Sequence, residues 1–303
     1  MLGDSMGSQR YKPLLLIISR IKSHLSNRRS IWLLLCGLLF AWNTTLLWLA
    51  HTPDQYQCIN LLLWLGILID LEDQLPSLWP RPSKASAIVG SIILVAVVVR
   101  GSVIKDPYDL FYLLALPLLA TGLALLCRPV QDLKIFRKSL AIASLFPILF
   151  LIGHVISSVF GLKLANMSAF STWTLLTTIG FKPTLVGEKV FLGSGGIDVN
   201  IGCSGFDQIV FSLSIVLIFL LLFPLRQKSN ILAVLLLSVV IALLCNVVRL
   251  SLLAYFTSLT GHLGVDLFDF FHASHGSLIF SLISASFVGY LYLVILDREL
   301  QSK

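Results

Sequence analysis

Long apolar runs separated by short polar breaks dominate this chain. Eight of the runs approach the length that a helix needs to cross a bilayer. They cover residues 31–50, 57–70, 85–99, 110–127, 139–160, 206–224, 229–256 and 274–296. Several breaks between them mix proline with charge, as in "WPRPSK", "KDPYD", "CRPVQDLK" and "FPLRQKSN". The pattern predicts an all-α polytopic membrane protein with about eight transmembrane helices.

One stretch departs from this pattern. Residues 161–202 are polar and rich in glycine, so they are predicted to form a small folded loop before helix six. Within it, "KVFLGSGGIDVNIG" is typical of a strand, a turn and a second strand. The chain is thereby divided into a basic N-terminal segment at 1–30, helices one to four at 31–138, and a C-terminal part at 139–303. The last part holds helices five to eight and the loop 161–205.

Composition agrees with a membrane protein. Hydrophobic residues make up 57% of the chain and charged residues 12%, about half the charge typical of a soluble domain. The net charge of +7 indicates no nucleic-acid partner, because Lys and Arg in a membrane protein chiefly orient its helices. The expected surroundings are membrane lipids. The five cysteines have no paired spacing, and no cofactor or metal is predicted.

The basic residues predict the orientation of the helices. With a cytoplasmic N-terminus, sixteen of the 22 Lys and Arg residues fall on the cytoplasmic side, five fall outside, and Arg249 lies within a helix. This bias follows the positive-inside rule, so both termini are expected in the cytoplasm and the loop 161–205 outside. Residues 10–29 are basic and partly amphipathic, and they are expected to lie on the cytoplasmic membrane surface.

Three chemically useful residue types then converge on the extracytoplasmic side. Cys203 precedes helix six, in a Gly-Cys-Ser-Gly turn. Arg249 lies about 20 residues into helix seven, which begins on the cytoplasmic side. These residues rise by roughly 30 Å along the helix axis, the thickness of the hydrocarbon core, so Arg249 reaches its outer boundary. The stretch "FFHASHG" places His272 and His275 at the outer end of helix eight, where three residues of separation put them on one helix face.

Cysteine, arginine and histidine at one depth can perform acyl transfer. A thiolate attacks a carbonyl, an imidazole accepts the thiol proton, and a guanidinium stabilises the negative charges that form. Asn246 stands one turn before Arg249 on the same helix face. The small residues Ser204 and Gly205 allow close backbone approach, and their N–H groups could act as additional oxyanion donors.

Each residue also has a structural explanation. Cys203 could form a disulfide with Cys58, which also falls on the outer side. Arg249 could extend to the interface without any catalytic role. The two histidines could cap a helix or bind a metal, and a nearby Asp266 or Asp269 could orient one of them. A transporter or a non-catalytic scaffold for envelope assembly are the alternative functions, although polar residues clustered at one face argue against a transporter.

Three ordered motifs carry a family resemblance. "GCSGFDQIVFS", "NVVRLSLLAYF" and "FHASHGSLIF" resemble the motifs of the exosortase/archaeosortase family of membrane-embedded enzymes, over roughly residues 145–296. Chain length and motif style look most like the cyanobacterial branch, the cyanoexosortases. The resemblance implies a catalytic Cys203, an arginine in Asn-x-x-Arg at Arg249, and a histidine in His-x-x-x-Gly at His272, with His275 as its rival.

The same resemblance implies a substrate and a place of action. Members of this family are thought to act on exported proteins that end in a short Pro-Glu-Pro-like motif, a transmembrane helix and a basic tail. The expected activity is that of a cysteine peptidase or transpeptidase that cleaves this tripartite sorting signal through a thioacyl intermediate. The expected site lies on the extracytoplasmic face of a bacterial inner membrane.

Overall fold

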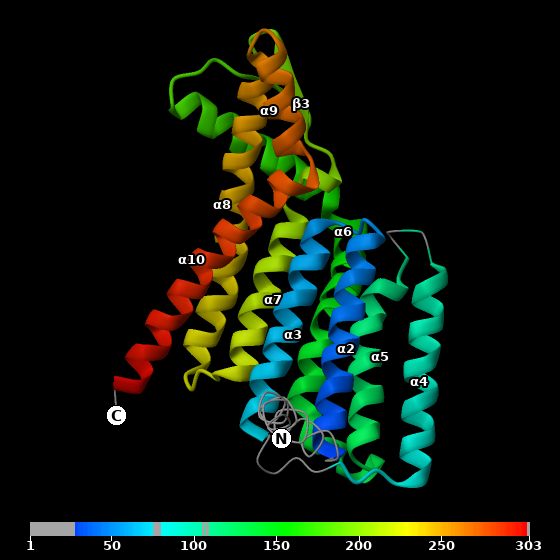
Figure 1. Ribbon diagram of the computed structural model, residues 1–303. Coiled ribbons are helices and arrows are strands. Elements are labelled where there is room, and N and C mark those ends of the chain that lie inside the picture. Colours follow the sequence, from blue (N-terminus) through cyan, green and yellow to red (C-terminus); the bar gives the residue numbers. More distant parts are fainter. Residues whose placement is uncertain (1–27, 75–79, 105, 107–108, 302–303) are drawn as a thin grey trace, which may run out of the picture.

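The computed structural model describes residues 28–74, 80–104, 106 and 109–301, so most of the predicted N-terminal segment 1–30 lies outside the described residues. The protein is mostly helical, and each of the eight apolar runs lies largely within one helix (Figure 1). These helices are α2 (Arg28–Leu49), α3 (Asp54–Gln74), α4 (Lys84–Val103), α5 (Phe111–Cys127), α6 (Arg137–Thr178), α7 (Phe206–Leu222), α8 (Lys228–Ser258) and α10 (Ser274–Gln301). The prediction of an all-α membrane protein is confirmed.

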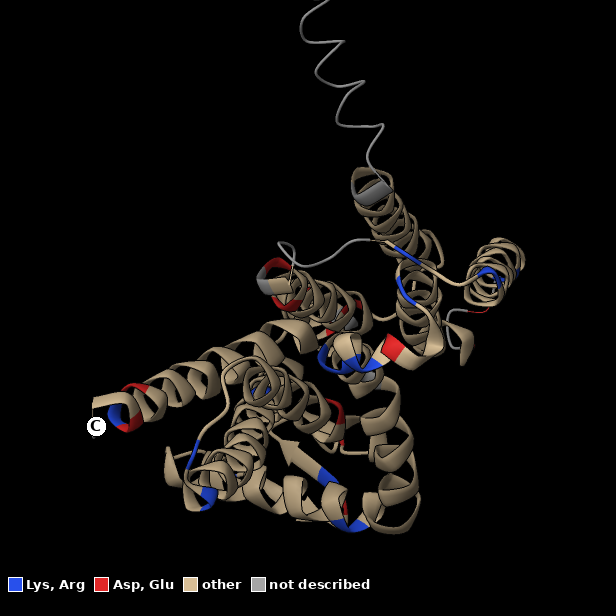
Figure 2. Cartoon of the chain, turned by 90° about the horizontal axis from the view of Figure 1, so that it is seen from below, with Lys and Arg blue, Asp and Glu red and all other residues tan. Residues whose placement is uncertain are grey.

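Among the described residues, six helices are long and apolar enough to cross a membrane. They are α2, α4, α6, α8, α10 and a span at Ile201–Leu222 that adds a short preceding helix to the 17 residues of α7, whereas α5 is apolar but has only its own 17 residues. α3 has the length to span, but polar residues occupy both its ends. Seen along the helix axes in Figure 2, most of the ribbon carries no charged residue. The count of eight spans therefore stays a prediction.

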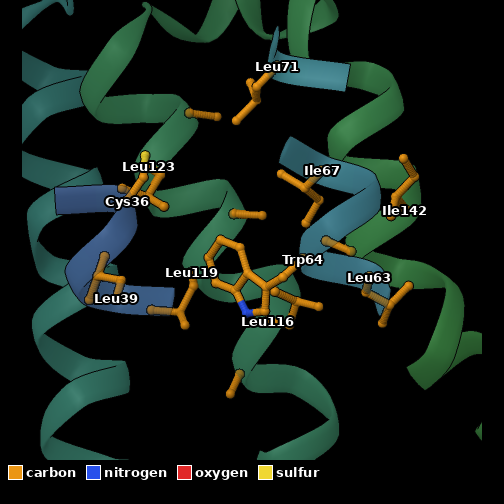
Figure 3. Close-up of a cluster of buried hydrophobic side chains, with 14 of the residues drawn as sticks. Cys36, Leu39, Leu63, Trp64, Ile67, Leu71, Leu116, Leu119, Leu123 and Ile142 are labelled. Atoms are coloured by element: carbon orange, nitrogen blue, oxygen red, sulfur yellow. The ribbon is translucent and has the colours of Figure 1, made fainter. Parts of the chain in front are cut away.

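Apolar side chains from α2, α3, α5 and α6 meet in the largest buried cluster (Figure 3). Trp64 of α3 lies at its centre, 2% exposed, and its indole N–H donates to Asn43 of α2 at 3.0 Å. Leu119 of α5 is fully buried against them. Asp70, where the second apolar run was expected to end, does not end the helix α3. It is buried and accepts a hydrogen bond from Ser139 of α6 at 2.6 Å, and α3 continues to Gln74.

The predicted loop 161–202 is wrong in its first half, because residues 161–178 continue α6. At 42 residues, α6 is about twice as long as a membrane span requires. In Figure 1 its C-terminal part turns away above the other helices. That part is an amphipathic helix rather than a loop. Ala165, Ala169 and Leu176 recur at helical spacing and are buried, whereas most of its polar side chains are exposed.

The second half of that segment contains the predicted strands and one more. β2 (Lys189–Leu192) and β3 (Gly195–Asp198) form the expected strand-turn-strand, and β1 (Thr184–Val186) adds a third antiparallel strand. β2 and β3 lie against the end of α8. We call residues 161–205, the C-terminal part of α8 from Asn246, and α9 (His262–His272) the cap. In Figure 1 the cap stands at the end opposite the C-terminus.

A compact apolar cluster holds the cap together. It joins the end of α6, the sheet and the end of α8, and Cys203 packs against its edge. Its buried members are Ala165, Ala169, Leu176, Val190, Leu192, Ile197, Val199, Leu250, Leu253 and Ala254. At the opposite end of the molecule, Glu299 of α10 accepts hydrogen bonds from the turn between α7 and α8, including one from the Arg226 N–H at 2.7 Å. The two ends of α8 are thus fixed independently.

Candidate active site

Cys203 lies in a tight turn between the sheet and α7. It ends a short 3₁₀ helix, η3 (Ile201–Cys203), whose N-cap is Asn200. The Asn200 side chain accepts a hydrogen bond from the Cys203 N–H at 3.0 Å, which is the usual way that an N-cap satisfies a free donor. The Cys203 side chain is half-buried. The backbone around the thiol is therefore held rigidly by local hydrogen bonds.

The next two residues fasten this turn to its neighbours. Ser204 is fully buried, and its carbonyl accepts a hydrogen bond from Ser168 of α6 at 2.8 Å. Gly205 has φ +90°, a left-handed conformation that favours glycine, and a Cβ there would stand 2.8 Å from the Asn246 amide nitrogen. Glycine is needed at this position both for the turn and for the close approach of α8.

Asn246 and Arg249 extend from α8 to two different segments. The Asn246 amide donates to the Cys203 carbonyl at 2.9 Å. The Arg249 guanidinium donates to the carbonyls of Phe271 and His272, at 3.1 and 3.2 Å. Arg249 is 5% exposed, so it does not extend into the interface as an isolated charge. One turn of α8 thereby links the turn that carries Cys203 to the helix that carries His272.

His272 does not begin the last helix, as the sequence suggested. It ends α9, Ala273 is extended, and α10 starts at Ser274. The Arg249 guanidinium therefore binds the carbonyl end of α9, where a cation is favourable. The His272 ring is exposed and stacks on Phe268 with centroids 5.1 Å apart. No hydrogen bond joins it to the Cys203 thiol in the described part of the chain.

Gly276 makes the break between the two helices possible. A Cβ there would stand 2.3 Å from the Phe271 Cα, so only glycine allows α10 to begin so close to the end of α9. The spacing His-x-x-x-Gly therefore has a physical basis in this fold. Because the break lies between them, His272 and His275 do not share a helix face, which corrects the prediction. His275 instead forms an ion pair with Asp54 at the start of α3.

Asp207 is a charged residue that sequence reasoning passed over. It stands in the first turn of α7, where an acidic residue is common, and so it attracted no attention. The structure places it within electrostatic range of both Cys203 and Arg249. Its only signal in the sequence was the spacing of four residues after Cys203.

The disulfide and metal explanations find no matching group among the described residues. All five cysteines lie within the described residues and all are free, so Cys203 and Cys58 form no disulfide. The described part of the chain contains no group of three or more His, Cys, Asp or Glu side chains that could hold a metal ion. Asp266 and Asp269, which could have oriented a histidine, both belong to α9.

A family model of transmembrane exosortases matches residues 42–289, well over half of the chain. The chain belongs to the transmembrane exosortase family. The match begins in α2 and ends in α10, so it extends across helices that lie outside the three motifs. No curated protein and no solved structure matches the chain. In this exosortase, Cys203, Asn246, Arg249 and the His272 backbone form one connected group in the cap.

Proposed function

We propose that this exosortase is a cysteine peptidase or transpeptidase that removes the C-terminal sorting signal of exported proteins, and that it belongs to the cyanobacterial branch of the family. The signal is a Pro-Glu-Pro-like motif, a transmembrane helix and a basic tail. Cys203 is the nucleophile, Arg249 stabilises negative charge, and His272 transfers protons. The site faces the extracytoplasmic side of the bacterial inner membrane, with both termini in the cytoplasm.

One observation carries the proposal. A buried arginine in an apolar protein needs partners, and Arg249 finds them in the backbone that holds His272 while remaining in electrostatic range of Cys203. Asn246, one turn earlier, binds the Cys203 carbonyl. The three motifs of the sequence are thus joined by hydrogen bonds and charge, as a site that assembles from three separate segments requires.

The chemistry follows from these positions. His272 accepts the Cys203 proton, and the thiolate attacks the carbonyl carbon of the scissile peptide bond. Arg249 stabilises the thiolate and then the oxyanion. The N–H groups of Cys203 and Ser204 already donate within the turn, so the additional oxyanion donors are those at the free start of α7. The C–N bond breaks, His272 protonates the leaving amine, and the acyl group stays on Cys203 as a thioester.

The first prediction tests Cys203 as nucleophile. In proteoliposomes with a tailed substrate peptide, Cys203→Ser should lower cleavage by more than about 10³-fold, because removal of a nucleophile removes the covalent route. Hydroxylamine should release the acyl group from the wild-type thioester, and the variant should yield none. A membrane-impermeant maleimide should label Cys203 from the extracytoplasmic side.

Cys58→Ser provides the matched control, because Cys58 is also half-buried and lies in the first turns of α3. It should cleave the substrate at the wild-type rate. Cleavage by Cys203→Ser close to the wild-type rate, at equal membrane levels, would reject the assignment of the nucleophile.

A further inference from the structure

A cavity of ≈ 230 Å³ lies between α3, α6 and α7, beside the turn that carries Cys203. Its wall from α7 contains Phe206 and Asp207, which follow Cys203 by three and four residues. Its wall from α6 contains His154 and Ser157, and α3 contributes Gln55 and Tyr56. This combination of an acidic group, a histidine, a hydroxyl and aromatic rings does not occur in two mostly apolar cavities of the bundle.

Three polar groups of this cavity are open to solvent rather than bonded to the rest of the chain. Asp207 and His154 are exposed and Ser157 is half-buried, and their side chains make no hydrogen bond or ion pair with any residue in the described ranges. Gln55 differs, because its amide donates to Ser277 and Ser281 of α10 and so fixes one wall in place. Asp207 and His154 therefore line an open cavity beside the turn of the proposed nucleophile, where they are available to a ligand.

The charge of Asp207 indicates the kind of ligand. A carboxylate within electrostatic range of Cys203 opposes the negative thiolate, so Asp207 is unfavourable for the first half of the reaction. Arg249 lies within electrostatic range of Asp207 but donates its hydrogen bonds to two carbonyls of α9, and no ion pair joins Asp207 to a basic group of the described chain. The same carboxylate attracts a cation. It also repels the glutamate of a Pro-Glu-Pro-like motif, which argues against this cavity as the site of that motif.

We propose that this cavity binds the primary ammonium group of the acceptor that resolves the thioester, an inference that rests on the proposed function. Asp207 accepts hydrogen bonds from the ammonium group, and Ser157 adds a further acceptor. His154 removes one proton to give the free amine. The amine nitrogen bonds to the acyl carbon, the C–S bond breaks, and the sulfur leaves as the Cys203 thiolate. The second proton lost by the nitrogen passes to that thiolate, so an amide and a free thiol result.

The experiment measures how the thioester divides between water and amine. Full-length protein in phosphatidylcholine vesicles receives the tailed peptide and a soluble primary amine, glycinamide. A second arm omits glycinamide and replaces part of the lipid with phosphatidylethanolamine, so the two arms distinguish a soluble acceptor from a lipid headgroup. Phosphatidylcholine cannot serve as an acceptor, because its nitrogen is quaternary. Release of the tail reports thioester formation, and the ratio of amide to acid product reports the acceptor.

Asp207→Asn should lower the amide-to-acid ratio at least tenfold in whichever arm the wild type forms amide. It should form the thioester at least as fast as wild type, because a negative charge beside the thiol is gone. These opposite effects would not follow from a merely structural role, which slows both steps. Ser157→Ala should lower the ratio by a smaller factor, and Asp207→Glu should partly restore it.

Asp198→Asn is the matched control. Asp198 is also within electrostatic range of Cys203, but it lies in β3 and does not line the cavity. Its removal should leave the amide-to-acid ratio as in wild type. An unchanged ratio in Asp207→Asn overturns the inference, as does a wild-type thioester that only water resolves. Absence of any wild-type thioester is a different result, because it rejects the proposed function itself.

Discussion

The bundle and the cap are held together by different kinds of contact. In the bundle, apolar side chains of four helices interlock around Trp64 and Leu119 (Figure 3). In the cap, side-chain donors bind backbone carbonyls: Ser168 binds Ser204, and Asn246 binds Cys203. Arg249 binds two more carbonyls at the end of α9. The bundle depends chiefly on shape and area, whereas the cap adds to its own apolar cluster a few directional bonds that fix the segments around Cys203 and His272.

This difference predicts how each region responds to substitution. Apolar packing is non-directional, so a smaller side chain leaves a cavity and lowers stability but moves no functional group far. A hydrogen bond fixes position, so its loss releases the segment that it held. Changes in the bundle should therefore reduce the amount of folded enzyme, and changes in the cap should reduce the activity of each folded molecule.

Among the hydrogen bonds of the cap, the largest effect is expected from the pair that Arg249 makes, which Arg249→Lys tests. Lysine keeps the charge but lacks the planar fork that binds both carbonyls, so it loses at least one of the two bonds. A lost bond to a buried group costs about 1–3 kcal/mol. We expect cleavage of the tailed peptide to fall roughly 10- to 100-fold per inserted molecule, as each 1.36 kcal/mol is about tenfold in rate.

Leu119→Ala tests the other side of the same comparison. Leu119 is fully buried in the bundle, and its truncation should cost about 2–5 kcal/mol of stability. The yield of folded protein should drop, measured by resistance to proteolysis in detergent, while cleavage per folded molecule stays within about twofold. Equal losses of specific activity in both variants would show that the two regions do not differ in this way.

The helices of the bundle were predictable because one physical requirement sets their composition. A helix that crosses lipid must be apolar over its whole length, and hydropathy alone finds it. The strands β2 and β3 were equally predictable from the sequence, since glycines marked the turn between them. The approach of Cys203, Asn246 and Arg249 also followed from orientation and helix length, before any family was considered.

The cap was harder to predict because its helices obey no such requirement. Residues 161–178 are half polar, and their helix is stabilised by Ala165, Ala169 and Leu176 packing on the sheet and α8. The break at Ala273 contains no proline and no glycine at the extended residue. It depends instead on the approach of Gly276 to Phe271, a contact between two helices. Tertiary packing of this kind leaves little signal in a single sequence.

A smaller effect is expected from Gly276→Ala, which tests the break itself. The new Cβ would stand 2.3 Å from the Phe271 Cα and 2.7 Å from the Phe270 carbonyl oxygen, so backbone must shift. Overpacking of this kind costs about 1–3 kcal/mol. Cleavage should fall about tenfold as His272 moves. Gly289→Ala on the same helix is the control, because its Cβ meets Phe219 at an ordinary 3.5 Å. A comparable loss of cleavage in Gly289→Ala would show that the loss does not depend on the contact between Gly276 and Phe271.

The smallest effect is expected at His275, and it separates the two histidines. His275 is 71% exposed in its side chain and pairs with Asp54 at the surface. Exposed ion pairs contribute about 0–1 kcal/mol, so His275→Ala should lower cleavage by less than about fivefold. His272→Ala should lower it by about 10²–10⁴, the range of a lost general base.

Asp54→Asn shows whether a loss of cleavage in His275→Ala has a structural cause. If His275 only helps to hold the start of α10 against α3, then Asp54→Asn should cause the same small loss, and the double variant should lose no more than either single one. A His275 that transfers protons would behave differently, because its removal would stop cleavage while Asp54→Asn left it nearly intact. An inactive His275→Ala beside an active His272→Ala would reverse the assignment. The exosortase motif would then use the histidine after the helix break, in α10, and the stacking of His272 on Phe268 would be purely structural.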